Sequence, residues 1–282
     1  MKTFKTLLFI SFLAITSISF AQEESIELLD EANQYYELKD YNKALEIYNN
    51  IVFNYKKSEV FPLALYNKAK TLEMLGEYDY AVFIYEKFLN GTYNDETFID
   101  ASLMSNPYAN FSYKSATGIA GIAYDKGNFQ KAYDYYNLAD TVYIYKSFCG
   151  NDGMERYYEL VQLRAKCLEK LERDEDAIKL CVKFIFPGML GSTDEIVDEL
   201  IRIIDRSQNR EDIKLALNNS LKDIYKKTFG RNNDYEAYCF KLFGEEVVVT
   251  DYLEPWKEID TEEKAKEKIL ATTFFQNYMK EK

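Results

Sequence analysis

The sequence predicts an all-α fold, a right-handed α-solenoid of stacked helical hairpins with a C-terminal helical cap. Alanines recur in four pairs, twelve residues apart within each pair: Ala32 and Ala44, Ala69 and Ala81, Ala120 and Ala132, Ala165 and Ala177. Apolar residues around them are spaced by three and four, as in an amphipathic helix with one buried stripe. Turn-favouring residues lie within each pair. Because a lone hairpin cannot bury both of its faces, the four units must stack.

Larger residues keep the same register as the alanines. Four residues after the second alanine of each pair stand Tyr48, Tyr85, Tyr136 and Cys181, and three before it stand Tyr41, Tyr78, Phe129 and Asp174. The expected turns contain Lys39-Asp40, Gly76, Gly127-Asn128 and Arg173-Asp174. We expect each alanine at a close helix crossing, where only a small side chain fits. The fourth unit is the most degenerate, because Asp174 and Cys181 replace aromatic residues.

Three segments, Ala32–Tyr48, Ala69–Tyr85 and Ala120–Tyr136, resemble the tetratricopeptide repeat (TPR). The match is closest from Ala64 to Val82, and the resemblance extends roughly from Glu24 to Pro187. The chain is similar in this respect to the TPR proteins of bacterial envelopes. The resemblance implies a protein-binding scaffold, because this repeat is used for interactions in many unrelated roles.

The array is uneven, since the second alanines of successive pairs are 37, 51 and 45 residues apart, against a typical repeat of about 34. The additional residues fall in Gly91–Phe111 and Thr141–Met154, which contain Gly, Asn and Pro and are expected to be loops.

Beyond Pro187-Gly188 the repeat pattern fades. We expect a helix from Thr193 or Asp194 to about Arg206, a partner helix over Arg210–Phe229, one strand over Glu245–Tyr252 and a final helix over Thr261–Met279. The predicted organisation is a leader over residues 1–21, four TPR-like repeats over residues 22–190 and a capping region over residues 191–282.

The first residues are typical of a secretory signal. Lys2 and Lys5 precede an apolar run from Leu7 to Ile15, and a small-residue segment ends at Ala21. We expect cleavage between Ala21 and Gln22, and a periplasmic or secreted protein. A membrane anchor is the alternative, but the run is shorter than the roughly 20 apolar residues that span a bilayer. No later stretch predicts membrane insertion.

Composition excludes several functions. The formal net charge of −12 is wrong for a nucleic-acid binder, which needs a basic face. The chain has no histidine, the commonest general base and metal ligand. No nucleophile, phosphate-loop or metal-ligand motif stands out, so we predict no enzyme activity, no catalytic residues, no cofactor and no metal. The acids Asp194, Glu195, Asp198 and Glu199 are interpreted as favourable charges at a helix start.

Cysteine usage leaves two interpretations open. Cys167 and Cys181 fall at core positions of the repeat pattern and are expected to be buried thiols. Bridges between Cys149 and Cys239, or between Cys167 and Cys181, are the alternative for an exported chain.

The resemblance implies that the first helix of each hairpin lines a concave groove that holds a peptide. The residues expected to face this groove are Asn33, Tyr36, Tyr66, Lys70, Glu73, Lys114, Tyr124, Gln162 and Lys166. Rings supply contact area, amides bond a peptide backbone and lysines pair with acids. An ordinary solvated face is the alternative. The identity of the protein or peptide partner is not encoded in a recognisable motif.

A carbohydrate-binding helical-repeat module is the alternative function, because sugars stack on aromatic rings and tyrosine is abundant. Some TPR proteins clamp a C-terminal carboxylate, and Asn33, Asn67 and Lys114 match three of the clamp positions. Leu29 and Gly118 replace two of the cationic residues that such a clamp requires, which argues against it.

Overall fold

A computed structural model describes residues 22–91, 93, 106–186, 191–230, 235–250 and 259–280. The predicted leader and residues 187–190, which begin with Pro187-Gly188, lie outside these ranges. The chain divides into two compact units, Met1–Ile122 and Ala123–Lys282, and the division falls within one helix. Within the described ranges, none of the helices combines the length and apolarity needed to cross a membrane.

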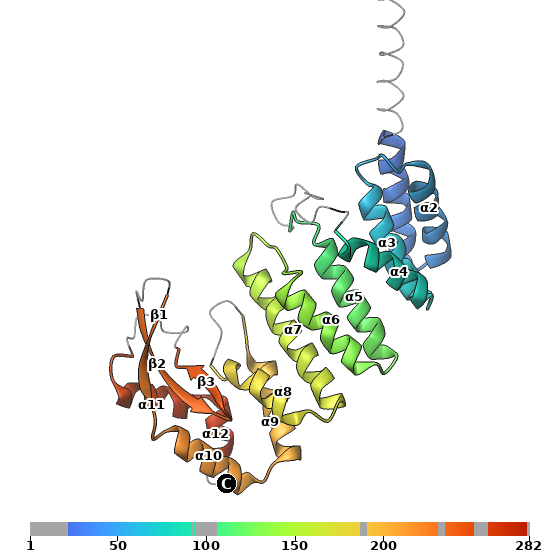
Figure 1. Ribbon diagram of the computed structural model, residues 1–282. Helices are drawn as coiled ribbons and strands as arrows, with labels where there is room; N and C mark the ends of the chain where they lie inside the picture. The colour runs from blue at the N-terminus through green and yellow to red at the C-terminus, as the bar shows by residue number, and fades with distance from the viewer. Residues whose placement is uncertain are drawn as a thin grey trace, which may run out of the picture. The chain divides into compact units, whose positions relative to one another are not determined.

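The first unit consists of helices that pack as successive antiparallel neighbours (Figure 1). Residues 22–37 are helical and are followed by α2 (Tyr41–Asn54), α3 (Phe61–Met74), α4 (Tyr78–Leu89) and α5 (Phe111–Asp125). Helix α3 packs against both α2 and α4. This arrangement is the TPR-like hairpin stacking that the sequence predicts.

The paired alanines occupy the interior, as expected. All eight, Ala32, Ala44, Ala69, Ala81, Ala120, Ala132, Ala165 and Ala177, have no exposed surface. The residues four positions later, Tyr48, Tyr85, Tyr136 and Cys181, are also buried. The register inferred from the sequence is therefore confirmed in all four repeats, including the degenerate fourth.

The turn between the helices of each repeat has the same geometry four times. The residue five positions before the second alanine has a positive φ, namely Lys39 (62°), Gly76 (79°), Gly127 (75°) and Glu172 (58°). In the first turn the Lys39 amide donates to the Tyr36 carbonyl and the Asp40 amide to the Tyr35 carbonyl, both at 2.9 Å. This is a Schellman motif, which ends one helix and starts the next within a few residues.

These turns give a paired test of the repeat register. Lys39→Gly should raise the free energy of unfolding by about 0.5–1 kcal/mol, because glycine adopts a positive φ without steric cost. Gly76→Lys should lower it by about 1 kcal/mol through backbone strain alone, since no atom lies within 4 Å of a Cβ built there. Urea unfolding followed by circular dichroism measures both. Shifts of the same sign would contradict the shared geometry.

The second unit continues the hairpins and adds a small sheet. Its elements after α5 are α6 (Phe129–Thr141), α7 (Gly150–Lys170), α8 (Asp174–Cys181), a short 3₁₀ turn η1 (Val182–Phe184), α9 (Asp194–Ser207), α10 (Arg210–Ser220), β1 (Tyr225–Phe229), β2 (Tyr235–Leu242), β3 (Glu245–Val248), α11 (Glu262–Ala271) and α12 (Thr273–Met279). Helix α7 packs between α6 and α8, and α8 packs against α9.

The three strands form an antiparallel sheet in the order β1-β2-β3 (Figure 1). Phe243 and Gly244 connect β2 to β3 with φ values of 50° and 84°. Two successive positive φ values match a two-residue type I′ hairpin, whose twist suits the flanking strands. The expected single strand is thus one of three, and the expected helix over Arg210–Phe229 is wrong after Ser220.

Two further boundaries differ from the expectation. Helix α7 begins at Gly150, so the loop expected over Thr141–Met154 ends earlier. The final helix is divided at Thr272, whose ψ of 145° is extended and whose side chain accepts from the Phe275 amide to start α12. The helix expected from Thr193 or Asp194 is confirmed as α9.

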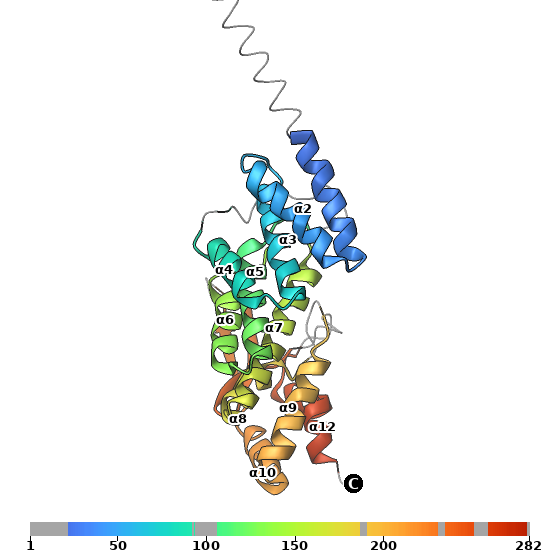
Figure 2. The ribbon, with the colours of Figure 1, turned by 90° about the vertical axis from the view of Figure 1, so that its right-hand side faces the viewer.

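One hydrophobic core joins the fourth repeat to the C-terminal elements. It extends from Tyr158 and Val161 of α7 through α9 and the sheet to Phe274 and Tyr278 of α12. Helices α9 and α12 lie side by side (Figure 2), and the Tyr278 hydroxyl donates to the Asp205 carboxylate at 2.9 Å. The C-terminal elements therefore cover the last repeat and do not form a separate core.

Candidate functional site

The polar residues predicted for the first hairpins lie on one side of their helices. Asn33 and Lys70 each follow the first alanine of their pair by one residue, and Tyr36 and Glu73 follow it by four. Positions three or four apart share a helix face, so the set forms a continuous surface within the first unit. We call Asn33, Tyr36, Asn67, Lys70 and Glu73 the tyrosine–lysine face.

An amide pair links the first two repeats on this face. The Asn33 Oδ1 atom accepts from Asn67 Nδ2 at 2.9 Å and from the Tyr48 hydroxyl at 2.6 Å. Asn33 Nδ2 and Asn67 Oδ1 have no partner within the part of the chain that the structure describes. The buried Tyr48 hydroxyl thus fixes the orientation of the Asn33 amide, and the Asn33 amide in turn fixes that of Asn67.

A second group of side chains, Lys70, Glu73 and Tyr85, holds the charged groups of this face in place. Lys70 Nζ lies 3.2 Å from the Glu73 carboxylate, and the Tyr85 hydroxyl donates to the same carboxylate at 2.7 Å. Tyr85 is fully buried, and burial raises the pKa of its hydroxyl. Burial, with the nearby Tyr41 and Glu73, also raises the pKa of Tyr36. The hydroxyls are therefore protonated donors at neutral pH.

Tyr66 belongs more to the framework than to the open face. Its ring centroid lies 5.9 Å from that of Tyr85, 6.0 Å from Phe88 and 5.8 Å from Phe111. Lys114 Nζ lies 6.0 Å from the Tyr66 ring. Burial raises the pKa of the Tyr66 hydroxyl. Removing this ring would open an aromatic cluster as well as remove contact area.

The carboxylate clamp does not assemble. Asn33 and Asn67 are bonded to each other, and Leu29 is buried with 5 % exposure where a cation would be required. A Cβ atom on Gly118 would lie 2.8 Å from Tyr85 Cε2, so the Tyr85 ring occupies the space that a larger residue needs.

The remaining predicted groove residues, Tyr124, Gln162 and Lys166, belong to the second unit. Tyr124 and Gln162 are half-buried and Lys166 is exposed. Burial is the main cause that raises the pKa of Tyr124, and the nearby Glu169 carboxylate adds to it. These residues are not part of the tyrosine–lysine face, which lies within the first unit.

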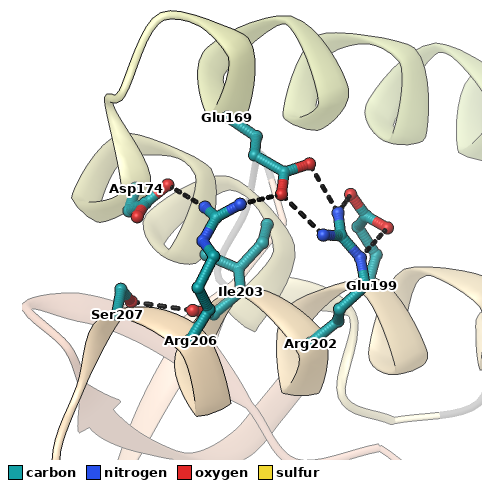
Figure 3. A network of polar contacts seen from close by, with 7 residues as sticks. All are labelled: Glu169, Asp174, Glu199, Arg202, Ile203, Arg206 and Ser207. Carbon is teal, nitrogen blue, oxygen red and sulfur yellow. Dashed lines mark hydrogen bonds and ion pairs between the residues drawn. The ribbon is translucent and has the colours of Figure 1, made fainter.

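The second unit holds an ion-pair network that sequence reasoning missed (Figure 3). Arg202 of α9 donates through both terminal nitrogens to the Glu169 carboxylate of α7 at 2.5 Å and also pairs with Glu199. Arg206 bonds the same Glu169 and, at 2.5 Å, Asp174 of α8. The Glu169 carboxylate thereby joins α7 to α9, and Arg206 extends the network to Asp174 of α8. The Arg202 hydrogen bonds lower the pKa of Glu169.

Replacing the charged Glu169 by a neutral residue should measure how much this network contributes to the free energy of unfolding. Glu169→Gln should lower the free energy of unfolding at pH 7 by about 1–2 kcal/mol, a moderate figure because Arg202 and Arg206 are half-exposed. The lowered pKa means that this stability is full above the ordinary value of 4.5 and is lost as pH falls through the folded value. Urea unfolding at pH 7 and pH 3 should show that the difference in free energy of unfolding between the wild type and the variant is smaller at pH 3. A constant difference would contradict the assignment.

Helix α4 carries an unusual pair of exposed rings. Its outward positions hold Tyr80 and Phe83, which are 66 % and 59 % exposed. The equivalent positions of the other second helices hold charged residues, namely Lys43 and Glu46, Lys131 and Asp134, Asp176 and Lys179. This outward face of the second repeat is a competing surface for a partner.

The cysteines and the acidic residues at the start of α9 occupy positions that the fold explains. Cys167, Cys181 and Cys239 are buried free thiols and Cys149 is an exposed one. Burial raises the pKa of Cys167 and Cys181 to about 12. Asp194 and Glu195 lie in the first turn of α9. Among the described residues, no cluster of three or more histidine, cysteine or acidic side chains could hold a metal ion.

Comparisons with known proteins assign no family to this chain. No protein-family model matches the sequence, and no curated protein matches it. Among solved structures, the chain is similar to a putative kinesin light chain of Podosopora anserina with nearly identical TPR-like repeats, at 14 % identity and a TM-score of 0.48. The match covers 69 % of this chain and 92 % of that chain. The TPR-like description of this fold rests on its buried alanines and its four equivalent turns.

Proposed function

We propose that the protein is an exported, non-catalytic scaffold that binds a peptide or protein segment on its tyrosine–lysine face. TPR-like hairpins are typical of protein–protein interaction scaffolds. The observation that carries the proposal is the Asn33–Asn67 pair, whose second amide donor and acceptor no described residue engages, beside Tyr36 and the Lys70–Glu73 ion pair.

The chemistry of this face suits an extended peptide. A donor and an acceptor side by side match the alternating groups of a peptide backbone, and the half-buried Tyr36 ring supplies contact area. Tyr48 and Tyr85 already hold the polar groups in place, so binding orders few side chains. Most repeat-position tyrosines are interior, which favours peptide over sugar.

Export is supported by the leader pattern in residues 1–21 and by the acidic composition, which suits a protein free in solution. Cell fractionation of a tagged chain tests this part of the proposal. We expect recovery from the periplasm or medium in a form shortened by the leader. Full-length protein confined to the cytoplasm would refute export while leaving the binding face open to test.

Affinity capture tests the binding face. Purified mature protein and its Tyr36→Ala/Lys70→Ala variant are immobilised in parallel, exposed to envelope extracts and compared by quantitative mass spectrometry. Proteins held by the first and lost by the second are ligands of the tyrosine–lysine face. Equal capture by both would refute the proposed site.

A further inference from the structure

The first described residue, Gln22, is held against the loop between α2 and α3. Its carbonyl accepts from the Ser25 hydroxyl at 2.7 Å, and the Ser25 and Ser58 hydroxyls lie 2.6 Å apart. The Glu59 amide donates to Gln22 Oε1 at 3.4 Å, a long and weak bond. The first described turn of this helix is therefore anchored mainly through backbone and serine contacts.

The side-chain nitrogen of Gln22 differs from its two oxygens in hydrogen bonding. In the uncleaved chain, Gln22 Nε2 is buried and has no hydrogen-bond partner among the described residues. A buried donor without an acceptor is destabilising, because its hydration is lost without replacement. The fold thus holds the oxygen of this amide and leaves its nitrogen unsatisfied.

A cleaved chain would add a second unfavourable group at the same residue. Cleavage before Gln22 would leave an α-ammonium at the start of a helix that is already formed at residue 22. Positive charge is disfavoured at a helix N-terminus because the unsatisfied amide groups there are themselves partially positive.

We propose that Gln22 is a modification site at which the mature chain is closed to an N-terminal pyroglutamate. The inference rests on the leader cleavage that belongs to the proposed function. The α-nitrogen attacks Cδ of the same residue, the N–Cδ bond forms, the Cδ–Nε2 bond breaks and the amide nitrogen leaves as ammonia. The α-amine supplies the proton that ammonia needs, and no oxidant or other co-reactant enters.

The reaction removes both unfavourable groups together. The nitrogen that leaves is the buried one without a partner, and the lactam nitrogen carries no charge. The Gln22 carbonyl and its bond from Ser25 are untouched, and only the long contact with Glu59 must shift. The product lacks the free α-amine that aminopeptidases require, which suits a protein outside the cell.

Intact-mass and N-terminal peptide mass spectrometry of freshly secreted protein test the inference. We expect a chain beginning at residue 22 that is lighter than the sequence by one ammonia, and whose first residue is released by pyroglutamyl aminopeptidase. The matched control is Gln22→Asn, which keeps the amide but is one carbon too short to form the five-membered ring. It should be secreted with an open N-terminus and resist that enzyme.

The other outcomes separate the inference from its premise. A mature chain with unmodified Gln22 would overturn the pyroglutamate and leave export standing. A modification absent from fresh protein and gained only on storage would overturn it in the same way. A chain beginning at Met1 or at a residue other than 22 would overturn the inference together with the predicted cleavage.

Discussion

Replacing Ala81 with leucine is expected to lower the free energy of unfolding by about 1–3 kcal/mol. Ala81 lies in α4, has no exposed surface and is in a helix that packs against α3. A leucine adds three carbons to a crossing with no room for them, so helices or rotamers must shift. Urea unfolding followed by circular dichroism and by tyrosine fluorescence measures the loss.

The control for this variant is Glu86→Leu on the same helix. Glu86 is exposed, and leucine and glutamate have similar helix propensities, so its stability should stay within about 0.5 kcal/mol of the wild type. Equal unfolding midpoints for Ala81→Leu and the wild type would show that α4 does not pack as the repeat register requires.

The repeat framework was predictable because each of its positions has one physical requirement. Close helix crossings need a small side chain, and all eight alanines satisfy this need. The turns were less obvious at Lys39 and Glu172, since a positive φ is usually taken by glycine. Lys39 lies within the expected first turn, but the expected fourth turn, Arg173-Asp174, is one residue late. The register of Gly76 and Gly127 would have indicated Glu172.

The sheet was missed because its signals are short. Strand β1 follows directly after α10, and its Lys226 and Lys227 are compatible with an amphipathic helix. The aromatic run of β2 followed by Phe243-Gly244 is the signal that could have identified a hairpin. The local sequence pattern could not distinguish strand from helix here, because the strands are stabilised by a core shared with α7, α9 and α12.

The sequence predicted which candidate residues share a helix face, but it did not predict the contacts that their side chains make. Helical spacing placed Tyr36, Lys70 and Glu73 on one face, yet it gave no sign that Tyr66 packs among three other rings. The Glu169–Arg202 pair joins residues 33 apart in sequence, and no periodicity reports such a contact. Long-range side-chain pairing depends on how helices stack, which a single sequence does not specify.

The Tyr36→Ala/Lys70→Ala variant is expected to weaken partner binding at least about tenfold, or about 1.4 kcal/mol. Interfaces concentrate affinity in a few anchors, and tyrosine beside a fixed charge is a frequent anchor. The changes spare Tyr66 and Tyr85, whose rings pack together, and they spare Asn33, which holds Tyr48. Helicity should therefore be unchanged.

A Lys43→Ala/Tyr80→Ala variant provides the matched control. It removes the same two residue types, the half-buried Lys43 of α2 and the exposed Tyr80 of α4, outside the tyrosine–lysine face. Titration of the captured partner against all three proteins by calorimetry should give unchanged affinity for this control and a large loss for the first variant. The reverse result would place the partner on the outward face of the second repeat, where Tyr80 and Phe83 are exposed. Equal affinity for all three proteins would show that the partner binds neither the tyrosine–lysine face nor the outward face of the second repeat. Each variant removes one ring and one charge, so binding at either surface should be weakened.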